Sequence, residues 1–179
     1  MKVLEKILFA GFGGQGILSI GKIFADACIE NDMQASWLPS YGPEMRGGTA
    51  NCSVVIGDEP VSSPIVDRPD ILAAMNLPSL DKYEGAVTPG GWIFIDSSLA
   101  DRRAAREDVH AVYVPATRLA AENGMSGLAN MILLGSLLEK RNAFDEGLIR
   151  DALKSAVSAK RPELYEMNLK ALRLGRGTV

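Results

Sequence analysis

The sequence predicts an α/β fold: a three-layer α/β/α sandwich with a Rossmann-like, mostly parallel sheet and a hairpin insert. Apolar runs of strand length alternate with longer helical patterns along most of the chain. The first run leads into a glycine-rich loop and then an apolar helix, which is the opening of a nucleotide-binding βαβ unit. No repeat or low-complexity tract interrupts this alternation, so residues 1–179 are interpreted as one domain.

The predicted elements follow from the spacing of apolar residues and from turn residues. Strands are expected at residues 7–10, 34–38, 49–57, within 58–66, and at 70–75, 92–96 and 111–114. Helices are expected at residues 17–30 and 77–86, from residue 116 onward, and at 128–140, 145–159 and 163–174. The strand at 49–57 and a short return strand within 58–66 form the predicted hairpin insert. Residues 175–179 are expected to fray.

The glycine loop is the first candidate site, with the sequence Gly11-Phe12-Gly13-Gly14-Gln15-Gly16. Its first, third and sixth positions fit the pattern G-x-G-x-x-G. Glycines allow a tight turn and a close approach of the backbone to a phosphate, and a helix start favours an anion. The amide of Gln15 is expected to contact a ligand or a neighbouring chain. The alternative is that the glycines only shape a tight turn.

A dinucleotide site needs a further residue that this sequence does not offer. NAD-type sites carry an acidic residue about 20 residues after the glycines, where it holds the ribose hydroxyls. The predicted strand at residues 34–38 ends without an Asp or Glu, and Asp32 lies before it. The sequence therefore argues against a NAD-type site, but a stand-alone NAD(P)-dependent enzyme is kept as an alternative.

A second unusual loop follows the predicted second strand. Its candidate site residues are Tyr41, Gly42, Pro43, Glu44, Arg46, Gly47 and Gly48. It should lie near the carboxyl edge of the sheet, where ligands and partners of open α/β sheets gather. Arg46 can hold a carboxylate or phosphate through two hydrogen bonds. Glu44 is either a base or the ion-pair partner of Arg46.

Asn130 is the third candidate, because a polar amide near the start of so apolar a helix needs a partner. It either caps the helix or holds a neighbouring loop or subunit. Cys28 and Cys52 lack C-x-x-C partners and are expected as buried structural thiols. The single histidine, His110, is expected at a strand edge. No catalytic residue and no metal ligand is predicted in this chain.

Composition excludes several classes of function. A net charge of −3 without a basic run gives nucleic-acid binding no electrostatic support. No apolar run reaches membrane-spanning length, and the amino terminus does not read as a signal peptide. A cytoplasmic location is therefore expected.

These motifs together resemble the gamma subunit of 2-oxoacid:ferredoxin (or other acceptor) oxidoreductases, over nearly the whole chain. The resemblance rests on residues 11–16, 40–48, 63–64, 69–70, 114–116, 129–131 and 135. The form Tyr-Gly-Pro-Glu-Met-Arg-Gly-Gly at residues 41–48 looks most like the 2-oxoglutarate branch.

The resemblance implies a complex that decarboxylates a 2-oxo acid on thiamine diphosphate, passes electrons through iron–sulfur clusters to ferredoxin, and transfers the acyl group to coenzyme A. Alpha and beta subunits would carry thiamine diphosphate and Mg, and a ferredoxin-like delta subunit would be a further partner. This chain would hold none of these cofactors alone; isolated, it would be inactive and would form a homodimer.

For the two loops, the resemblance implies separate roles. The glycine loop would bind an anion, such as a phosphate of coenzyme A, or would pack on a partner. The loop at residues 41–48 would face the thiamine site, with Arg46 recognising charge. In a third possibility, the chain is a purely structural assembly module in which both loops are interface.

Overall fold

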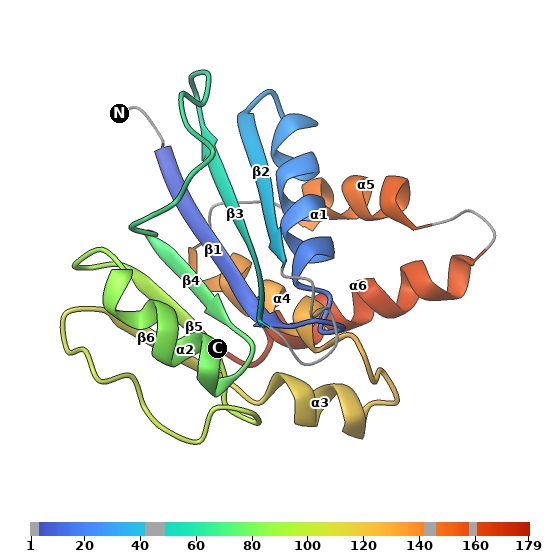
Figure 1. The fold of residues 1–179 in the computed structure, drawn as a ribbon. Helices are drawn as coiled ribbons and strands as arrows, with labels where there is room; N and C mark the ends of the chain where they lie inside the picture. Colours follow the sequence, from blue (N-terminus) through green and yellow to red (C-terminus); the bar gives the residue numbers. More distant parts are fainter. Residues whose placement is uncertain (1–3, 42–48, 142–145, 158–160) are drawn as a thin grey trace.

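The computed structural model describes residues 4–41, 49–141, 146–157 and 161–179, and its centre is a six-stranded sheet in the order β2-β3-β1-β4-β5-β6 (Figure 1). The strands are β1 (Leu4–Phe12), β2 (Gln34–Tyr41), β3 (Thr49–Gly57), β4 (Ile71–Ala74), β5 (Trp92–Asp96) and β6 (His110–Val114). Strands β1, β4, β5 and β6 are parallel, and β3 is antiparallel to both its neighbours. The predicted mostly parallel sheet is confirmed.

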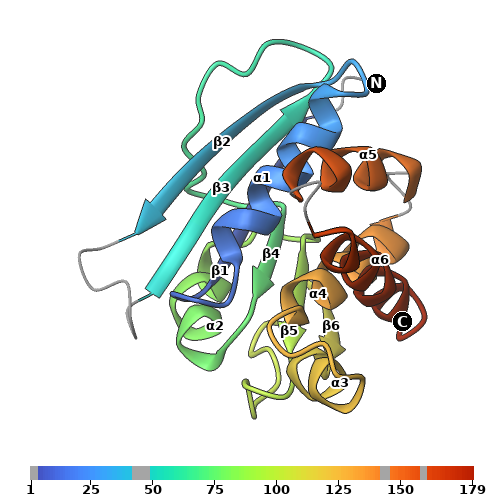
Figure 2. The ribbon, with the colours of Figure 1, turned by 90° about the vertical axis from the view of Figure 1, so that its right-hand side faces the viewer.

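The helices form the two outer layers. They are α1 (Ile17–Ile29), α2 (Leu77–Tyr83) with the short 3₁₀ helix η1 (Glu84–Ala86), α3 (Ala116–Glu122), α4 (Ala129–Arg141), α5 (Glu146–Ala156) and α6 (Pro162–Arg176). Figure 2 shows α1, α4, α5 and α6 gathered on one side of the sheet. Strand β1 serves both layers: Ile7 and Phe9 enter the core on that side, whereas Leu8 and Ala10 pack with Leu80 of α2 on the other. The three-layer prediction is confirmed.

The hairpin is built from different segments than the sequence suggested. Strand β3 pairs with β2 in the register Gln34↔Gly57 to Tyr41↔Ala50, and residues 58–66 form no strand. Both edges of β3 are already occupied by β1 and β2, so no free edge is left for a return strand. Pro60 and Pro64 also remove donors that a strand would need.

The carboxyl-terminal segment is packed where fraying was predicted, because α6 crosses α4 at two glycines. A Cβ on Gly175 would lie 1.9 Å from the carbonyl oxygen of Ile132, and one on Gly135 would lie 2.0 Å from that of Leu172. The two helix backbones therefore touch at this crossing, and the close contact holds α6 in place through Arg176.

Candidate functional site

The glycine loop turns the chain from β1 into α1. Glycine is favoured at three of its positions, for different local reasons. The N–H of Gln15 donates to the carbonyl of Phe12 at 3.2 Å, which closes a tight turn. Gly14 and Gly16 have φ angles of +94° and +73°, a backbone conformation that favours glycine. A Cβ on Gly11 would lie 2.7 Å from both Gln15 Oε1 and Ile17 Cδ1.

The outer side of this loop is open. Among the described residues no side chain caps α1, and its first turn holds no acidic residue. The first N–H groups of a helix have no partner within the helix, so they are available to an outside acceptor. A Cβ on Gly14 would meet no atom within 4 Å, so the backbone is accessible at this point. The loop therefore has the geometry of an anion site.

The side chain of Gln15 points into the protein, although the sequence suggested a contact with a ligand or a neighbouring chain. Its Oε1 accepts hydrogen bonds from the N–H of Phe12 at 2.6 Å and from Nδ2 of Asn76 at 3.1 Å. Its Nε2 donates to the carbonyl of Met75 at 3.1 Å. Gln15 thus bridges the carboxyl ends of β1 and β4.

Asn130 holds the same loop from the opposite side. Its Nδ2 donates to the carbonyl of Gly16 at 3.2 Å, and its Oδ1 accepts from the N–H of Met131 at 2.9 Å. A Cβ on Gly16 would lie 2.3 Å from Asn130 Nδ2. Of the alternatives that the sequence left open, the structure shows that Asn130 holds a neighbouring loop, and its Oδ1 also accepts an N–H in the first turn of its own helix.

Asn76 was not among the predicted site residues; it is the second residue beyond β4 and is only 1% exposed. Its Oδ1 accepts from the N–H of Ser79 at 2.9 Å and thereby caps α2, while its Nδ2 reaches Gln15. An asparagine after a buried strand, with a proline two positions on, is a typical helix-start signal that could have revealed the cap. Nothing in the sequence pattern predicts the contact with Gln15.

The sheet order removes the usual place for a ribose-binding acid. In a dinucleotide fold the strand next to β1 is parallel and carries the acid at its carboxyl end. Here the antiparallel strand β3 occupies that place, and its first residue, Thr49, lies opposite Phe12. The gap between β1 and β4 is bridged by Gln15 and Asn76. Both observations argue against a NAD-type site.

The second predicted loop begins beside the glycine loop. Gly42, Pro43, Glu44, Arg46, Gly47 and Gly48 lie outside the described residues. Tyr41 is the last residue of β2 and pairs with Ala50, whose other partner is Gly11. Tyr41 and Thr49, the described residues on either side of this segment, therefore lie at the same sheet edge as the glycine loop.

A cavity of about 240 Å³ adjoins the glycine loop at this edge. Its walls come from the loop, the end of β4, α3 and the turn before α4, and are formed by Gly14, Gln15, Met75, Leu99, Thr117, Ala120, Ala121, Ser126, Gly127 and Ala129. The buried carboxylate of Asp96 fixes one wall, because it accepts from the Thr117 hydroxyl at 2.5 Å and the Thr117 N–H at 3.1 Å.

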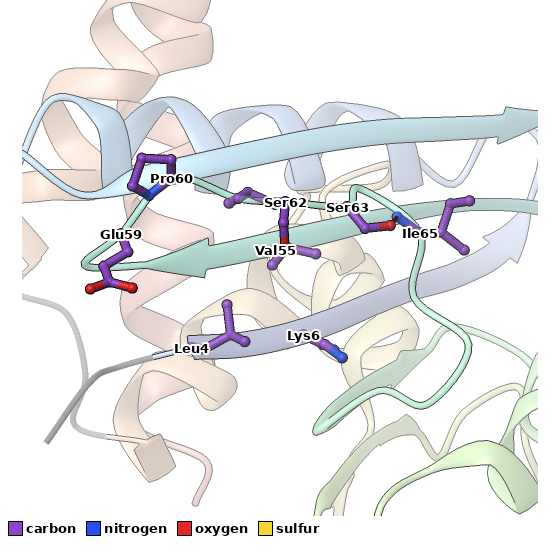
Figure 3. A pocket seen from close by; sticks show the side chains of 9 residues that line it. Leu4, Lys6, Val55, Glu59, Pro60, Ser62, Ser63 and Ile65 are labelled. Atoms are coloured by element: carbon purple, nitrogen blue, oxygen red, sulfur yellow. Dashed lines mark hydrogen bonds between the residues drawn. The ribbon is translucent and has the colours of Figure 1, made fainter.

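A second cavity, of about 300 Å³, lies far from these residues. Figure 3 shows it between the β1 side chains Leu4 and Lys6 and the segment that carries Pro60, Ser62 and Ile65. None of the predicted site residues lines it.

The cysteines and the histidine behave as structural residues. Cys28 and Cys52 are free and buried, and burial raises the pKa of each thiol to about 12. The Sγ of Cys52 donates to the carbonyl of Ile17 at 3.3 Å. His110 begins the edge strand β6, where its ring centroid lies 4.7 Å from that of Trp92. Among the described residues, no three His, Cys, Asp or Glu side chains gather as a metal site.

Comparison with known proteins shows which family the sequence matches. A family model described as pyruvate ferredoxin/flavodoxin oxidoreductase matches residues 6–178. The chain is 43% identical over 171 residues to the ketoisovalerate oxidoreductase subunit VorA of Methanothermobacter marburgensis, covering 95% of this chain and 35% of VorA. It is 35% identical over 160 residues to the 2-oxoglutarate synthase subunit KorC of Methanocaldococcus jannaschii, covering 88% of this chain and 86% of KorC.

The structure agrees with these matches. It is similar to the keto/oxoacid ferredoxin oxidoreductase gamma subunit of Geobacter sulfurreducens, with a TM-score of 0.81 and 28% identity, covering 97% of this chain and 96% of that one. Within the described ranges, no helix has both the length and the apolar character needed to cross a membrane. The chain belongs to the pyruvate ferredoxin/flavodoxin oxidoreductase family, and its resemblance to the gamma subunits of 2-oxoacid:ferredoxin oxidoreductases is confirmed.

Proposed function

We propose that this chain is the non-catalytic gamma subunit of a complex that decarboxylates a 2-oxo acid, forms its acyl-coenzyme A and reduces ferredoxin. Support comes from the match to 86% of KorC, which is itself a single subunit. Thiamine diphosphate, Mg and the iron–sulfur clusters would then lie on the alpha, beta and delta subunits. We expect the complex in the cytoplasm, in keeping with the free thiols of Cys28 and Cys52.

The proposed 2-oxo acid is 2-oxoglutarate, on the basis of the sequence at residues 41–48 and the similarity to KorC. The higher identity to VorA favours ketoisovalerate as a second candidate. The complex, purified through a tag on this chain, should be assayed for coenzyme A-dependent reduction of a viologen dye with both acids. A higher kcat/KM with ketoisovalerate would reject the 2-oxoglutarate assignment and keep the family.

The glycine loop is proposed to receive a phosphate of coenzyme A. The observation that carries this role is the uncapped start of α1 beside the open backbone at Gly14. The N–H groups and the helix dipole favour negative charge there. The loop at residues 41–48 is proposed to lie near the reacting 2-oxo acid, with Arg46 recognising its carboxylate. Full activity of an assembled Arg46→Ala complex would reject that role.

A matched pair of substitutions at Gly14 tests the anion site. Asparagine tolerates positive φ better than most residues and has nearly the shape of aspartate, so Gly14→Asn and Gly14→Asp differ mainly in charge. If a phosphate binds here, the aspartate variant should have a KM for coenzyme A about tenfold or more above that of the asparagine variant. Added salt should reduce the difference.

Gly90 provides the control for this pair, because its φ of +77° and its open surroundings match those of Gly14. It lies in the turn before β5, at the opposite edge of the sheet. Gly90→Asp and Gly90→Asn should therefore give equal KM values. Equal KM values for the two Gly14 variants in intact complexes would instead favour the assembly-module alternative.

A further inference from the structure

Asn76 occupies the junction between two layers of the fold and is almost completely buried. It follows β4 at the sheet edge that carries the glycine loop, and it begins α2 on the other face. Because α1 and α2 lie on opposite faces of the sheet, the gap between β1 and β4 is the point where the connections diverge. Ligands of open α/β sheets bind at such points.

The orientation of the Asn76 amide is fixed by the cap of α2. Its Oδ1 accepts the N–H of Ser79, a group without a partner inside the helix. The Nδ2 group must therefore point to the other side, where it donates to Gln15 Oε1 at 3.1 Å. The start of α2 thus determines which atom Asn76 presents to the glycine loop.

The Gln15 amide is oriented in turn. Its Oε1 faces two donors, Asn76 Nδ2 and the N–H of Phe12, while its Nε2 faces the carbonyl of Met75. Rotating the amide by half a turn would place donor against donor and acceptor against acceptor. The bond to Phe12 spans the same four residues as the turn of the loop, so it holds the loop in its observed shape.

We propose that Asn76 is a positioning residue that holds the glycine loop in its ligand-binding conformation through the side chain of Gln15. This inference rests on the proposed function, in which the loop receives a phosphate. The same bridge covers the gap between β1 and β4, so the phosphate approaches from the Gly14 side, beside the cavity of about 240 Å³. A dinucleotide that crosses the sheet edge would have to displace the bridge.

Asn76→Ser separates the two contacts of Asn76. Serine is as good a helix cap as asparagine, so the bond to Ser79 is kept, but its hydroxyl is too short to reach Gln15. Asn76→Asp also keeps the cap and places an acceptor against Gln15 Oε1. Asn123→Ser is the matched control, since it removes an amide whose Nδ2 donates to the carbonyl of Leu119 on α3.

Two measurements on the intact complex test the proposal. Hydrogen exchange by mass spectrometry should be faster in peptides that contain residues 12–16 of both Asn76 variants and unchanged there in Asn123→Ser. The KM for coenzyme A should rise about three- to tenfold, the loss expected for one hydrogen bond, while kcat stays within about twofold. A purely structural role would not separate KM from kcat in this way.

The outcomes distinguish this proposal from the proposed function. Unchanged exchange in both Asn76 variants would overturn the positioning role, whatever binds to the loop. Faster exchange with an unchanged KM for coenzyme A would also overturn it, while a charge effect at Gly14 would still support the phosphate site. Equal KM values for the two Gly14 variants would reject the proposed phosphate-binding role of the glycine loop itself.

Discussion

Gly16 and Asn130 should be energetically coupled, and the structure allows the size of the coupling to be worked out. Alanine at Gly16 would adopt a φ of +73°, which alone costs ~1–2 kcal/mol. Its Cβ would also lie 2.3 Å from Asn130 Nδ2 and displace that side chain. The lost bond to the Gly16 carbonyl adds about 1 kcal/mol, so Gly16→Ala should destabilise the chain by about 2–3 kcal/mol.

Asn130→Ala removes the same bond from the other partner. The carbonyl of Gly16 keeps its bond from the N–H of Ile20 at 3.1 Å, so the expected loss is about 1 kcal/mol. In the double variant the bond can be lost only once. The free energy of unfolding should therefore fall by about 1 kcal/mol less than the sum of the two single losses.

Urea unfolding of the purified chain, followed by circular dichroism, would measure this coupling. Gly124→Ala is the control, because Gly124 has a φ of +67° but a Cβ there would meet no atom within 4 Å. It should lose only the ~1–2 kcal/mol of backbone strain and should show no coupling with Asn130→Ala. Additive losses at Gly16 and Asn130, within about 0.5 kcal/mol, would refute the argument.

Two further predictions concern the core. Gly175→Ala should lower the unfolding free energy by about 1–3 kcal/mol, because the Cβ would collide with the fixed carbonyl of Ile132. Gly177→Ala, whose Cβ would lie 3.7 Å from its nearest neighbours, should stay within about 0.5 kcal/mol; equal losses in urea titrations would contradict this account. The thiols of Cys28 and Cys52 have a pKa of about 12 in the folded chain, against the ordinary value of 9.0. Above pH 9 the thiols therefore lose their protons more readily in the unfolded chain than in the folded one. The free energy of unfolding should for this reason fall as the pH rises from 9 to 12. Alanine at both cysteines should flatten that pH profile, and an unchanged slope would contradict the assignment.

The parts of the fold that could be predicted from the sequence depend on local chemistry. Strand β5 begins and ends at the predicted residues, Trp92 and Asp96, around the apolar run of the sequence. The glycine loop could be predicted because positive φ at Gly14 and Gly16 is a backbone property of glycine. Each of these features follows from the residue type and its immediate neighbours.

The features that were missed, or were left open between alternatives, depend on partners distant in the sequence. The contact between Gln15 and Asn76 joins residues 61 positions apart, and that between Asn130 and Gly16 joins residues 114 apart. The alternation in residues 49–57 predicts a strand but not which strands flank it. Likewise, Gly175 reads as a helix terminator, and only its contact with Ile132 explains why α6 continues.

The antiparallel strand β3 makes the surroundings of this glycine loop differ from those in a dinucleotide fold. Strand β3 takes the place beside β1 that would otherwise carry a ribose-binding acid. The same hairpin places Thr49 opposite Phe12 and aligns Tyr41 with Gly11 through Ala50. One rearrangement of the sheet thus removes a binding determinant for a dinucleotide and brings the end of β2 and the start of β3 to the edge that carries the glycines. Gln15 and Asn76 close the glycine loop toward β4, so its open backbone lies on the Gly14 side.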